Sequence, residues 1–496
     1  MKVYAFKYNL SFAVKCVISF FVLYAFTFQV TAQPSYPPSI QQYIDYKQDT
    51  IALIHCAVAD VIHKKILAEQ TIIISHGIIT ATGNANTVTI PNGATIIDCT
   101  GKSVLPGFVL LHEHMYYPAV SVSPSYVHLK QLPVTFPRLY LACGVTTIRT
   151  AGSVEPYSDL SLKKEIDSNK IIGPTMYVTA PYLEGQGSFF PQMHEIKNAD
   201  EAKKFVNFWA DEGFTSFKAY MNLDSASLKA AIKTAHARGL KITAHLCAVT
   251  YHEAAEMGID QLEHGFLAAT DFIPNKKADA CFFSDNPLAK IDPYGKQAKD
   301  LINFLVQHKV IITSTLAVFE GLCTQDTIPK QEVLDAMSPD TRDMYVKYYS
   351  HEKSAGMNDA VAKDFIMEKE FADAGGLLTA GTDPTGNGGT LAGYGSLRAI
   401  ELLTKEGFTP IEAIRIATYN GAVALNAQKN IGSIEVGKIA DLIVLNKNPL
   451  HDIHNSREIR YVMRDGVLYD GNTLDEIWPE QKKCPEWRLK NVSASK

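Results

Sequence analysis

Eight short apolar segments alternate along the chain with stretches that have the apolar spacing of helices. The stretches 199–212 and 225–238 show this helical spacing, and Gly213 and Gly239 follow them as helix stops. Eight successive strand–helix units predict a (β/α)8 TIM barrel, whose functional side chains come from the carboxyl ends of its strands. The strand-like segments are residues 104–114, 146–152, 176–183, 216–221, 242–247, 261–266, 310–318 and 377–383.

The two ends of the chain have a different pattern, with short strands separated by turns. Residues 71–79 form an apolar run that His76-Gly77 interrupts, as a hairpin turn does. Residues 432–445 and 461–468 have the same character. Neither end can bury a two-sided sheet alone, so we expect them to pair into a small β-sandwich beside the barrel.

These patterns predict three parts after an N-terminal leader segment. A composite β-sandwich is expected from residues 33–105 and 426–475, the barrel from 106–425, and a solvated tail from 476–496. The segment 324–374 exceeds what one barrel helix needs and predicts a helical elaboration above the barrel mouth. It is either a lid or a surface helix pair without a role.

Residues 1–32 have the features of a secretory signal peptide. Three lysines and an apolar stretch at 16–30 precede Val30 and Ala32, which form a small-residue cleavage pattern. We expect cleavage near Ala32 and a periplasmic or secreted protein with no membrane attachment afterwards. The alternative is an uncleaved membrane anchor, for which the apolar run is slightly short.

Charge and cysteine usage exclude some classes of function. Without residues 1–32, 44 basic and 52 acidic side chains remain, a net charge of −8 that makes nucleic acid an unfavourable partner. The same region keeps seven cysteines at irregular spacing, which predicts no disulfide framework. Free buried thiols are expected, with one pair such as Cys56 and Cys99 as the alternative. The seven are Cys56, Cys99, Cys143, Cys247, Cys281, Cys323 and Cys484.

Side chains that can bind metal ions recur at the ends of the predicted strands. His112 and His114 are two residues apart, so on a strand they face the same way and can chelate one ion. Such a pair alone is weak evidence, but histidines recur at two later strand ends and an aspartate follows at the eighth. The full series is His112, His114, Lys218, His245, His264 and Asp383.

With these residues in place, the chain resembles the amidohydrolase superfamily, close to its imidazolonepropionase-like branch with the metal-dependent prolidases. The resemblance extends over nearly the whole chain after the leader, in the right order. The matching stretches are Val104-Leu105-Pro106-Gly107-Phe108 with His112-Glu113-His114, Gly144-Val145-Thr146-Thr147-Ile148-Arg149, Gln261-Leu262-Glu263-His264-Gly265, Ala380-Gly381-Thr382-Asp383 and residues 431–445.

The resemblance implies a site for two divalent metal ions. His112 and His114 would hold one ion together with Asp383, and His245 and His264 would hold the other. Lys218 would bridge them as N6-carboxylated lysine, since an ammonium cannot bind a cation until it loses its proton and reacts with carbon dioxide. Zinc is the expected metal for this nitrogen-rich set, although manganese, cobalt or iron would fit the same ligands.

The implied activity is hydrolysis of a carbon–nitrogen amide bond in a small molecule. The two ions would share a hydroxide as the nucleophile, and Asp383 would move its proton to the leaving amine. Candidate substrates are a dipeptide of the Xaa-Pro type, an N-acyl amino acid or a cyclic amide. The alternatives are a cyclic imide hydrolase or a deaminase and, from another class, a non-catalytic binding barrel. The oligomeric state stays open, with a homo-oligomer as one alternative.

Two family positions and two substrate contacts complete the expectations. The aspartate usual two residues before the first histidine is Leu110 here, so the groups that support His112 should differ from the family pattern. Glu113 should face away from the two histidines, either buried against helices or paired with a base, and have no catalytic role. Tyr220 shares the inward face with Lys218 and is a candidate substrate contact, as is His194 in the loop after the third strand.

Overall fold

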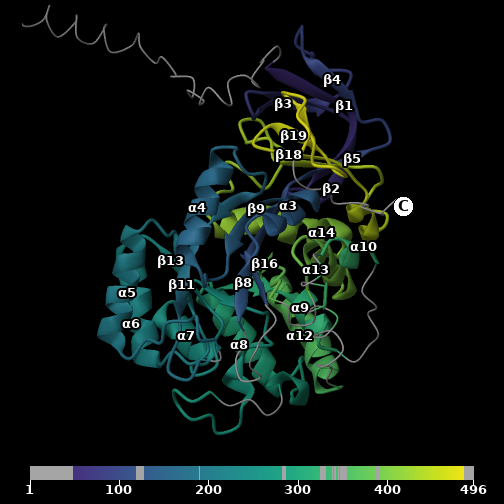
Figure 1. Ribbon diagram of the computed structural model, residues 1–496. Helices are drawn as coiled ribbons and strands as arrows, with labels where there is room; N and C mark the ends of the chain where they lie inside the picture. Colours follow the sequence, from purple (N-terminus) through teal and green to yellow (C-terminus); the bar gives the residue numbers. More distant parts are fainter. Residues whose placement is uncertain are drawn as a thin grey trace, which may run out of the picture. The chain divides into compact units, whose positions relative to one another are not determined.

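The computed structural model describes residues 49–484, apart from residues 119–127, 189, 282–285, 324–330, 386–389 and most of 338–354 (Figure 1). The expected signal peptide at 1–32 therefore lies outside the described residues. None of the helices in the described part is long and apolar enough to cross a membrane.

The two ends of the described chain meet in one nine-stranded sheet. In Figure 1 the purple N-terminal strands and the yellow C-terminal strands lie side by side. The junction is β5 against β17, an antiparallel pair in which Leu105 faces Ile443. The strands are β1 (Thr50–Asp60), β2 (Lys65–Ser75), β3 (Ile78–Asn84), β4 (Thr95–Asp98), β5 (Ser103–Pro106), β17 (Leu442–Leu445), β18 (Ile459–Arg464), β19 (Val467–Asp470) and β20 (Glu476–Trp478).

Local turn chemistry explains the hairpin in this sheet. His76 and Gly77 have φ angles of 50° and 76°, the pair of positive values that a two-residue hairpin turn needs. Strands β2 and β3 pair antiparallel on either side of it, with Ser75 opposite Ile78. The predicted hairpin is confirmed.

The prediction that a solvated tail starts at residue 476 is wrong. Residues 476–478 form β20, which pairs with β19, and Trp478 is buried. Its indole packs with Met463 and Leu468 in the core of the nine-stranded sheet, so burial of a large aromatic surface overrides the polar character of the surrounding residues.

Strand β17 is buried on both faces. Ile443 and Leu445 belong to the large core that also holds the helices and parallel strands of the chain's middle part, whereas Leu442 and Val444 belong to the core inside the nine-stranded sheet. This follows from the two-residue repeat of a strand, which sends alternate side chains to opposite faces. The sheet is thus attached to the rest of the molecule by apolar packing.

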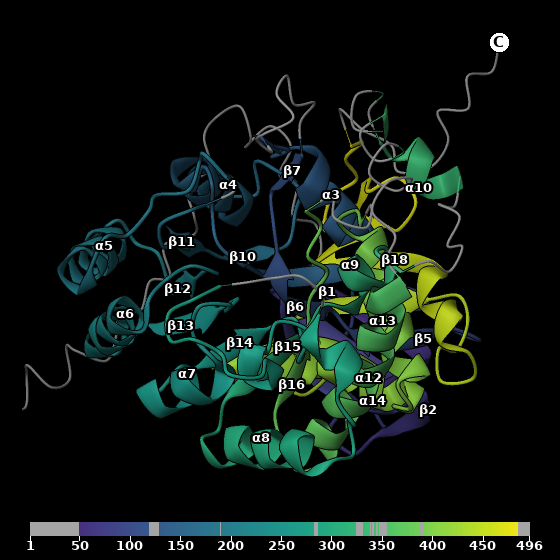
Figure 2. The same ribbon diagram turned by 90° about the horizontal axis from the view of Figure 1, so that it is seen from below.

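The middle part of the chain supplies parallel strands in chain order (Figure 2). They form a three-stranded sheet, β10-β9-β6, and a six-stranded sheet, β11-β12-β13-β14-β15-β16. The amides of Thr382 and Asp383, just after β16, donate to the carbonyl of His112 at 3.2 and 2.9 Å, so the first and last strands meet at their carboxyl ends. The strands are β6 (Phe108–Glu113), β9 (Val145–Thr150), β10 (Thr175–Tyr177), β11 (Thr179–Leu183), β12 (Ser216–Ala219), β13 (Lys241–Ala244), β14 (Gln261–Glu263), β15 (Ile311–Ser314) and β16 (Leu378–Ala380).

Each of the eight predicted strand segments contains a strand, but three differ from expectation. The segment 104–114 is divided at Gly107 between β5 of the nine-stranded sheet and β6 of the parallel strands. The segment 176–183 is divided between β10 and β11, because the Thr150 hydroxyl accepts the amide of Thr179 at 2.8 Å in place of a ladder bond. The segment 310–318 ends as a strand at Ser314 and continues as helix α9 (Leu316–Glu320).

Helices follow the strands as the alternation predicts. The predicted helices at 199–212 and 225–238 are α5 and α6, and Gly213 and Gly239 after them have φ angles of 98° and 69°. The helices are α3 (Thr135–Ala142), α4 (Pro156–Asp167), α5 (Ala199–Asp211), α6 (Ser225–Ala237), α7 (Tyr251–Met257), α8 (Lys296–Gln307), α10 (Gln331–Asp335), α12 (Ala355–Asp373), α13 (Tyr394–Lys405), α14 (Pro410–Arg415) and α15 (Gly421–Ala424).

Shorter elements complete the described chain. A hairpin of β7 (Tyr116–Pro118) and β8 (Leu129–Gln131) follows β6 directly. Within the predicted elaboration at 324–374, α12 accounts for residues 355–373, and much of the rest lies outside the described residues. The short helical turns are η1 (Thr270–Phe272), η2 (Pro287–Lys290), the π-helical η4 (Ile416–Asn420) and η5 (Ile453–Arg457).

Candidate metal centre

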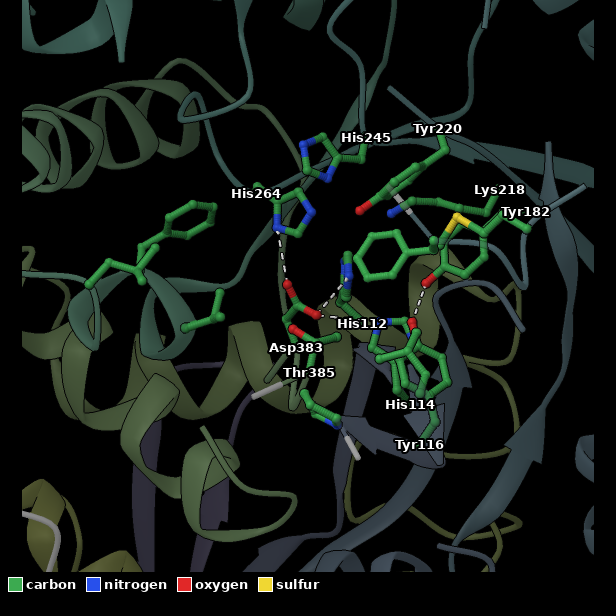
Figure 3. A pocket seen from close by; sticks show the side chains of 17 residues that line it. His112, His114, Tyr116, Tyr182, Lys218, Tyr220, His245, His264, Asp383 and Thr385 are labelled. Carbon is green, nitrogen blue, oxygen red and sulfur yellow. Dashed lines mark hydrogen bonds and ion pairs between the residues drawn. The ribbon is translucent and has the colours of Figure 1, made fainter. Parts of the chain in front are cut away.

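All six predicted metal ligands line one pocket at the carboxyl ends of the parallel strands (Figure 3). Lys218 lies within β12, whereas His245 and His264 follow β13 and β14 by one residue. Asp383 lies three residues after β16. The strand ends therefore bring together side chains that are up to 271 positions apart in the sequence.

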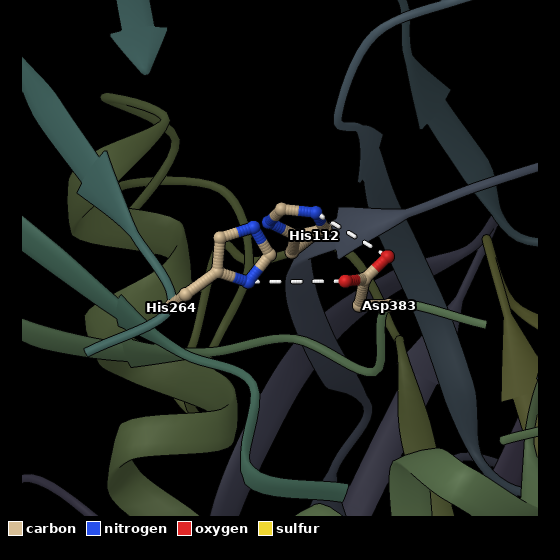
Figure 4. Close-up of side chains that lie close together, drawn as sticks. All are labelled: His112, His264 and Asp383. Atoms are coloured by element: carbon tan, nitrogen blue, oxygen red, sulfur yellow. Dashed lines mark ion pairs between the residues drawn. The ribbon is translucent and has the colours of Figure 1, made fainter. Parts of the chain in front are cut away.

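Asp383 is the centre of the cluster. Its carboxylate oxygens lie 3.6 Å from His112 Nε2, 3.3 Å from His114 Nε2 and 3.8 Å from His264 Nδ1. The ligand atoms of His112, His264 and Asp383 lie within 4.8 Å of one another, close enough to hold one ion (Figure 4). These three residues come from both of the ligand groups that the resemblance implies. His112 and Asp383 belong to the group of the first ion, and His264 belongs to the group of the second.

The backbone is strained at two of these residues. His264 and Asp383 have φ angles of 71° and 52°, in the left-handed region that non-glycine residues rarely adopt. Gly381 allows the close approach of this turn to β6, because a Cβ there would overlap His112. With this backbone conformation, both side chains point into the pocket.

A buried network supports His112 in place of the family aspartate that Leu110 replaces. Glu263 accepts from His112 Nδ1 at 2.7 Å and from Arg149 at 2.7 Å. Arg149 also donates to the carbonyl of Leu111 at 2.6 Å. Although burial opposes it, the positive charges of Lys218 and Arg149 lower the pKa of Glu263. The ionised Glu263 thus holds the proton of His112 on Nδ1 and leaves Nε2 free for a metal ion.

Lys218 is a buried amine without a partner. Its side chain is 1% exposed, and among the described residues Nζ has no hydrogen-bond acceptor. Burial lowers its pKa to about 8. A structural lysine would be paired, so this orphaned amine fits a residue that is modified to a carbamate ligand.

The other ligand pKa values also suit metal binding. Burial lowers the pKa of His245 to about 3 and those of His112 and His264 well below the ordinary value, so all three rings are neutral. Burial opposes ionisation of Asp383, but the neighbouring histidines outweigh it and lower its pKa to about 2. His112, His245 and His264 therefore offer neutral imidazoles and Asp383 an ionised carboxylate, the protonation states that metal ions require.

Three tyrosines form one wall of the pocket. The Tyr220 ring lies 5.1 Å from the His245 ring and 4.9 Å from that of Tyr182. The Tyr182 and Tyr116 hydroxyls are 2.5 Å apart, and the Tyr116 ring stacks on His114 at 4.5 Å. Tyr220 was predicted, whereas Tyr116 and Tyr182 were missed. Tyr116 continues the two-residue spacing of His112 and His114, a signal that could have found it.

The prediction for His194 is wrong. Its side chain is 56% exposed, 3.0 Å from Glu201, and its ring stacks on Phe205, so it turns toward α5 rather than into the pocket. The loop does reach the pocket, but through Phe190 and Met193. Sequence reasoning identified the right loop and the wrong side chain.

Glu113 is buried, as expected, and accepts the amide of Thr382 at 2.8 Å. Burial raises its pKa to about 8. It therefore links β6 to the turn that carries Asp383, and it is not one of the residues that line the pocket.

The expectation of free buried thiols is wrong for Cys247 and Cys281. Cys247 and Cys281, which are 34 positions apart in the sequence, form a disulfide that closes the loop between them. Cysteine spacing alone could not predict it, because the two residues meet only when the loop after β14 folds back over the end of β13. Cys56 and Cys99 are free and buried.

Sequence comparisons relate the chain to known hydrolases. Residues 103–469 match the model of the Amidohydrolase family. The chain is 35% identical over 113 residues to an imidazolonepropionase of Bacteroides fragilis, covering 22% of this chain and 27% of that protein. It is 37% identical over 76 residues to a 5'-deoxyadenosine deaminase of Methanobrevibacter smithii, covering 15% and 17%. The alignments span less than a third of these curated relatives.

Solved structures share the fold over much longer stretches. A Xaa-Pro dipeptidase with methionine bound in its active site has a TM-score of 0.64 and 17% identity, covering 85% of this chain and 100% of that one. A protein of Bifidobacterium longum assigned as a prolidase has a TM-score of 0.63 and 23% identity, covering 88% and 96%. The fold is therefore of the α/β TIM-barrel type. Because the family model spans most of the sequence, the chain belongs to the amidohydrolase family.

Proposed function

We propose that this chain is a binuclear metal-dependent hydrolase that cleaves an amide bond in a small substrate. The observation that carries the proposal is the convergence of six separate strand-end residues on one pocket, including a buried lysine without a partner. The Xaa-Pro dipeptidase and imidazolonepropionase among the similar proteins support dipeptides and cyclic amides as the first candidates, together with N-acyl amino acids.

The residues fit two ions, with zinc as the proposed metal. His112, His114 and Asp383 would hold one ion, His245 and His264 the other, and carboxylated Lys218 would bridge them. Bound there, the ions would polarise a carbonyl oxygen and lower the pKa of a water molecule. We also infer that the two parallel sheets close into one (β/α)8 barrel beside a sandwich made from both chain ends.

The chain's own residues supply proton transfer and orientation. Asp383 stays ionised at neutral pH, so its carboxylate can accept a proton from the attacking water and deliver it to the leaving nitrogen. Glu263 fixes the tautomer of His112, and the Thr315 hydroxyl lies 2.8 Å from His264 Nδ1, which leaves Nε2 of both rings free. The Tyr220 hydroxyl can donate to an oxygen of the substrate.

The test is Asp383→Asn, measured on metal-loaded protein with a panel of dipeptides, acyl amino acids and cyclic amides. The variant should lose turnover by about 10²- to 10⁴-fold, as expected for loss of a proton-transfer group, and should still hold metal by elemental analysis. Asp211→Asn, on the surface of α5, is the matched control and should keep full activity. Normal turnover of Asp383→Asn would remove the proton-transfer role.

The two alternatives have different readouts. A deaminase would release ammonia from its substrate and hold one ion per chain, and it would not need Lys218. A non-catalytic binding protein would leave the whole panel untouched with metal bound. The complete ligand set argues against both.

We propose further that the protein is exported, to the periplasm or outside the cell. The disulfide between Cys247 and Cys281 supports this location, because disulfides persist in oxidising compartments. Cell fractionation, with N-terminal sequencing of the recovered protein, tests it. Recovery in the cytosol with residues 1–32 intact would contradict the proposal.

A further inference from the structure

A second cavity lies at the amino-terminal part of β9 and β10, whereas the predicted metal ligands lie at the carboxyl ends of the strands. Thr147 of β9 and Thr175 of β10 line it on one side. Residues between 427 and 441 and the end of β18 line the other side. The cavity has a volume of about 300 Å³, which is enough for a small organic molecule. In the sequence, each of its lining residues is flanked on both sides by described residues.

Two buried side chains of opposite charge line this cavity. Arg464 is 4% exposed and Asp441 is 6% exposed. Among the described residues, Arg464 has one hydrogen-bond acceptor, Asn169 Oδ1 at 2.7 Å from Nη2, and it forms no ion pair. Burial raises the pKa of Asp441 to about 6, although the charge of Arg464 opposes this shift. Both charges therefore lack a direct ionic partner.

Two further carboxylates stand at the exposed edge of the cavity. Asp167 is paired with Lys163 at 2.7 Å. Asp465 is exposed, and its amide donates to Asp441 Oδ1 at 2.7 Å, so these two acidic residues are neighbours. The acidic groups open to a ligand are therefore Asp441 and Asp465, on the same side of the cavity as Arg464.

The rest of the lining is uncharged and divides into a polar and an apolar part. The polar part contains Asn430 and three hydroxyl groups, of which the fully buried Thr147 hydroxyl has no hydrogen-bond partner among the described residues. The other two hydroxyls belong to Thr175 and Tyr177. The apolar part consists of Ala427, Ile431 and Ile439.

This distribution of charge selects one class of ligand. A simple anion would pair with Arg464 but would be repelled by Asp441 and Asp465, and a simple cation would be repelled by Arg464. A molecule that carries both charges can pair with both sides of the cavity. Arginine suits its carboxylate in particular, because the planar guanidinium donates two parallel hydrogen bonds to such a group.

We propose that this cavity binds an apolar α-amino acid in its zwitterionic form. The carboxylate pairs with Arg464, the ammonium group pairs with Asp441 and Asp465, and the side chain packs against Ile431 and Ile439. The proposal does not depend on the proposed hydrolysis, since none of the described residues lines both this cavity and the metal pocket.

Matched ligands that each lack one charge test the proposal by calorimetric titration of the zinc-loaded protein. L-leucine is compared with L-leucinamide, which lacks the carboxylate, and with 4-methylpentanoate, which lacks the ammonium group. L-valine, L-valinamide and 3-methylbutanoate form a second set. We expect an amino acid to bind at least ~10-fold more tightly than both of its analogues, because each analogue leaves one buried charge without a partner. If neither amino acid binds, or neither binds more tightly than its analogues, the inference is overturned.

Variants identify the group that each charge meets. Arg464→Gln should weaken binding of the amino acid by ~10-fold or more and leave the affinity for its amide unchanged. Asp465→Asn tests the acidic side at an exposed position, where the substitution does not disturb the core, and should weaken the amino acid but not its deamino analogue. Arg238→Gln, at an exposed position after α6, is the control. Unchanged affinity for the amino acid in Arg464→Gln and in Asp465→Asn would contradict the assigned site.

Removal of the metal locates the bound amino acid. Because the cavity and the metal pocket share no described lining residue, chelator-treated protein should bind the amino acid with the same affinity as zinc-loaded protein. Binding that disappears with the metal would assign the amino acid to the metal centre and contradict a second site.

Discussion

At the residue scale, the convergence of the six candidate metal ligands on one pocket could be predicted, and the groups that support them could not. All six reach the pocket because each lies at or just after the carboxyl end of a strand, and parallel strands end at one edge. They are His112, His114, Lys218, His245, His264 and Asp383. Glu263 and Arg149 were missed as supporting groups, since their contact with His112 joins residues from three different strands. The sequence contains no local signal for such a contact.

The buried amine of Lys218 leads to a prediction about pH. Only the uncharged amine reacts with carbon dioxide, so carbamate formation in metal-free protein should speed up as pH rises through the pKa of about 8, well below the ordinary 10.5. Recovery of activity after adding zinc, at constant dissolved carbon dioxide, measures this rate. Removing carbon dioxide should slow recovery, and Lys218→Met should not recover at any pH. A midpoint near 10.5, or recovery independent of carbon dioxide, would contradict the bridging role.

Glu263 provides the second prediction at this scale. Glu263→Gln keeps the shape of the side chain but removes the charge that fixes the His112 tautomer and pairs with Arg149. Zinc affinity should fall by about 10- to 100-fold, as for other groups that orient a metal ligand. Competition with a chelator measures it. Glu435→Gln, at an exposed carboxylate that pairs with the buried Lys438, is the control, and equal zinc affinity in both variants would remove the supporting role.

At the element scale, strand positions were predicted well and strand ends less well. The segment 310–318 is apolar at both ends, with Thr313-Ser314-Thr315 between them, and its period does not reveal that β15 stops at Ser314 and α9 begins at Leu316. That change of direction places Val318 and Phe319 in the pocket. The loop that contains His194 illustrates the same limit, since a bond to Glu201 determines which side chain faces inward.

The disulfide gives a prediction about a loop and a strand end. It joins Cys247, two residues after His245, to Cys281 across 34 residues, and closing such a loop stabilises the folded state by up to about 4 kcal/mol in the chain-entropy model. Cys281→Ser should therefore lower the thermal midpoint by several degrees, measured by calorimetry. Cys484→Ser removes a free, partly exposed thiol and serves as the control. Equal midpoints for the two variants would show that the disulfide does not stabilise the fold.

At the scale of the whole molecule, the pairing of the two chain ends could be inferred because neither had enough apolar surface to fold alone. The register could not be inferred. Leu105 lies opposite Ile443 although 338 positions separate them, and β17 must present one apolar face to each of two cores. A strand that is apolar at every position is compatible with several registers, and only packing against both cores selects one.

This double burial predicts that the nine-stranded sheet and the metal centre unfold together. Ile443 packs against Gly144 and Phe108, next to the strand that carries His112, so Ile443→Ala leaves a cavity between the sheet and the parallel strands. The free energy of unfolding should fall by about 2–5 kcal/mol, as for other buried aliphatic truncations. In protein that carries Trp209→Phe and Trp487→Phe, Trp478 of β20 is the remaining tryptophan and reports on the sheet. Urea unfolding of this protein, followed by tryptophan fluorescence and by enzymatic activity, should give one shared midpoint with Ile443 and a lower shared midpoint with Ile443→Ala. Ile96→Ala, at a 55% exposed position of β4, should leave the midpoint unchanged. Loss of activity at lower urea than loss of fluorescence would show that the sheet folds independently of the part that holds the metal centre.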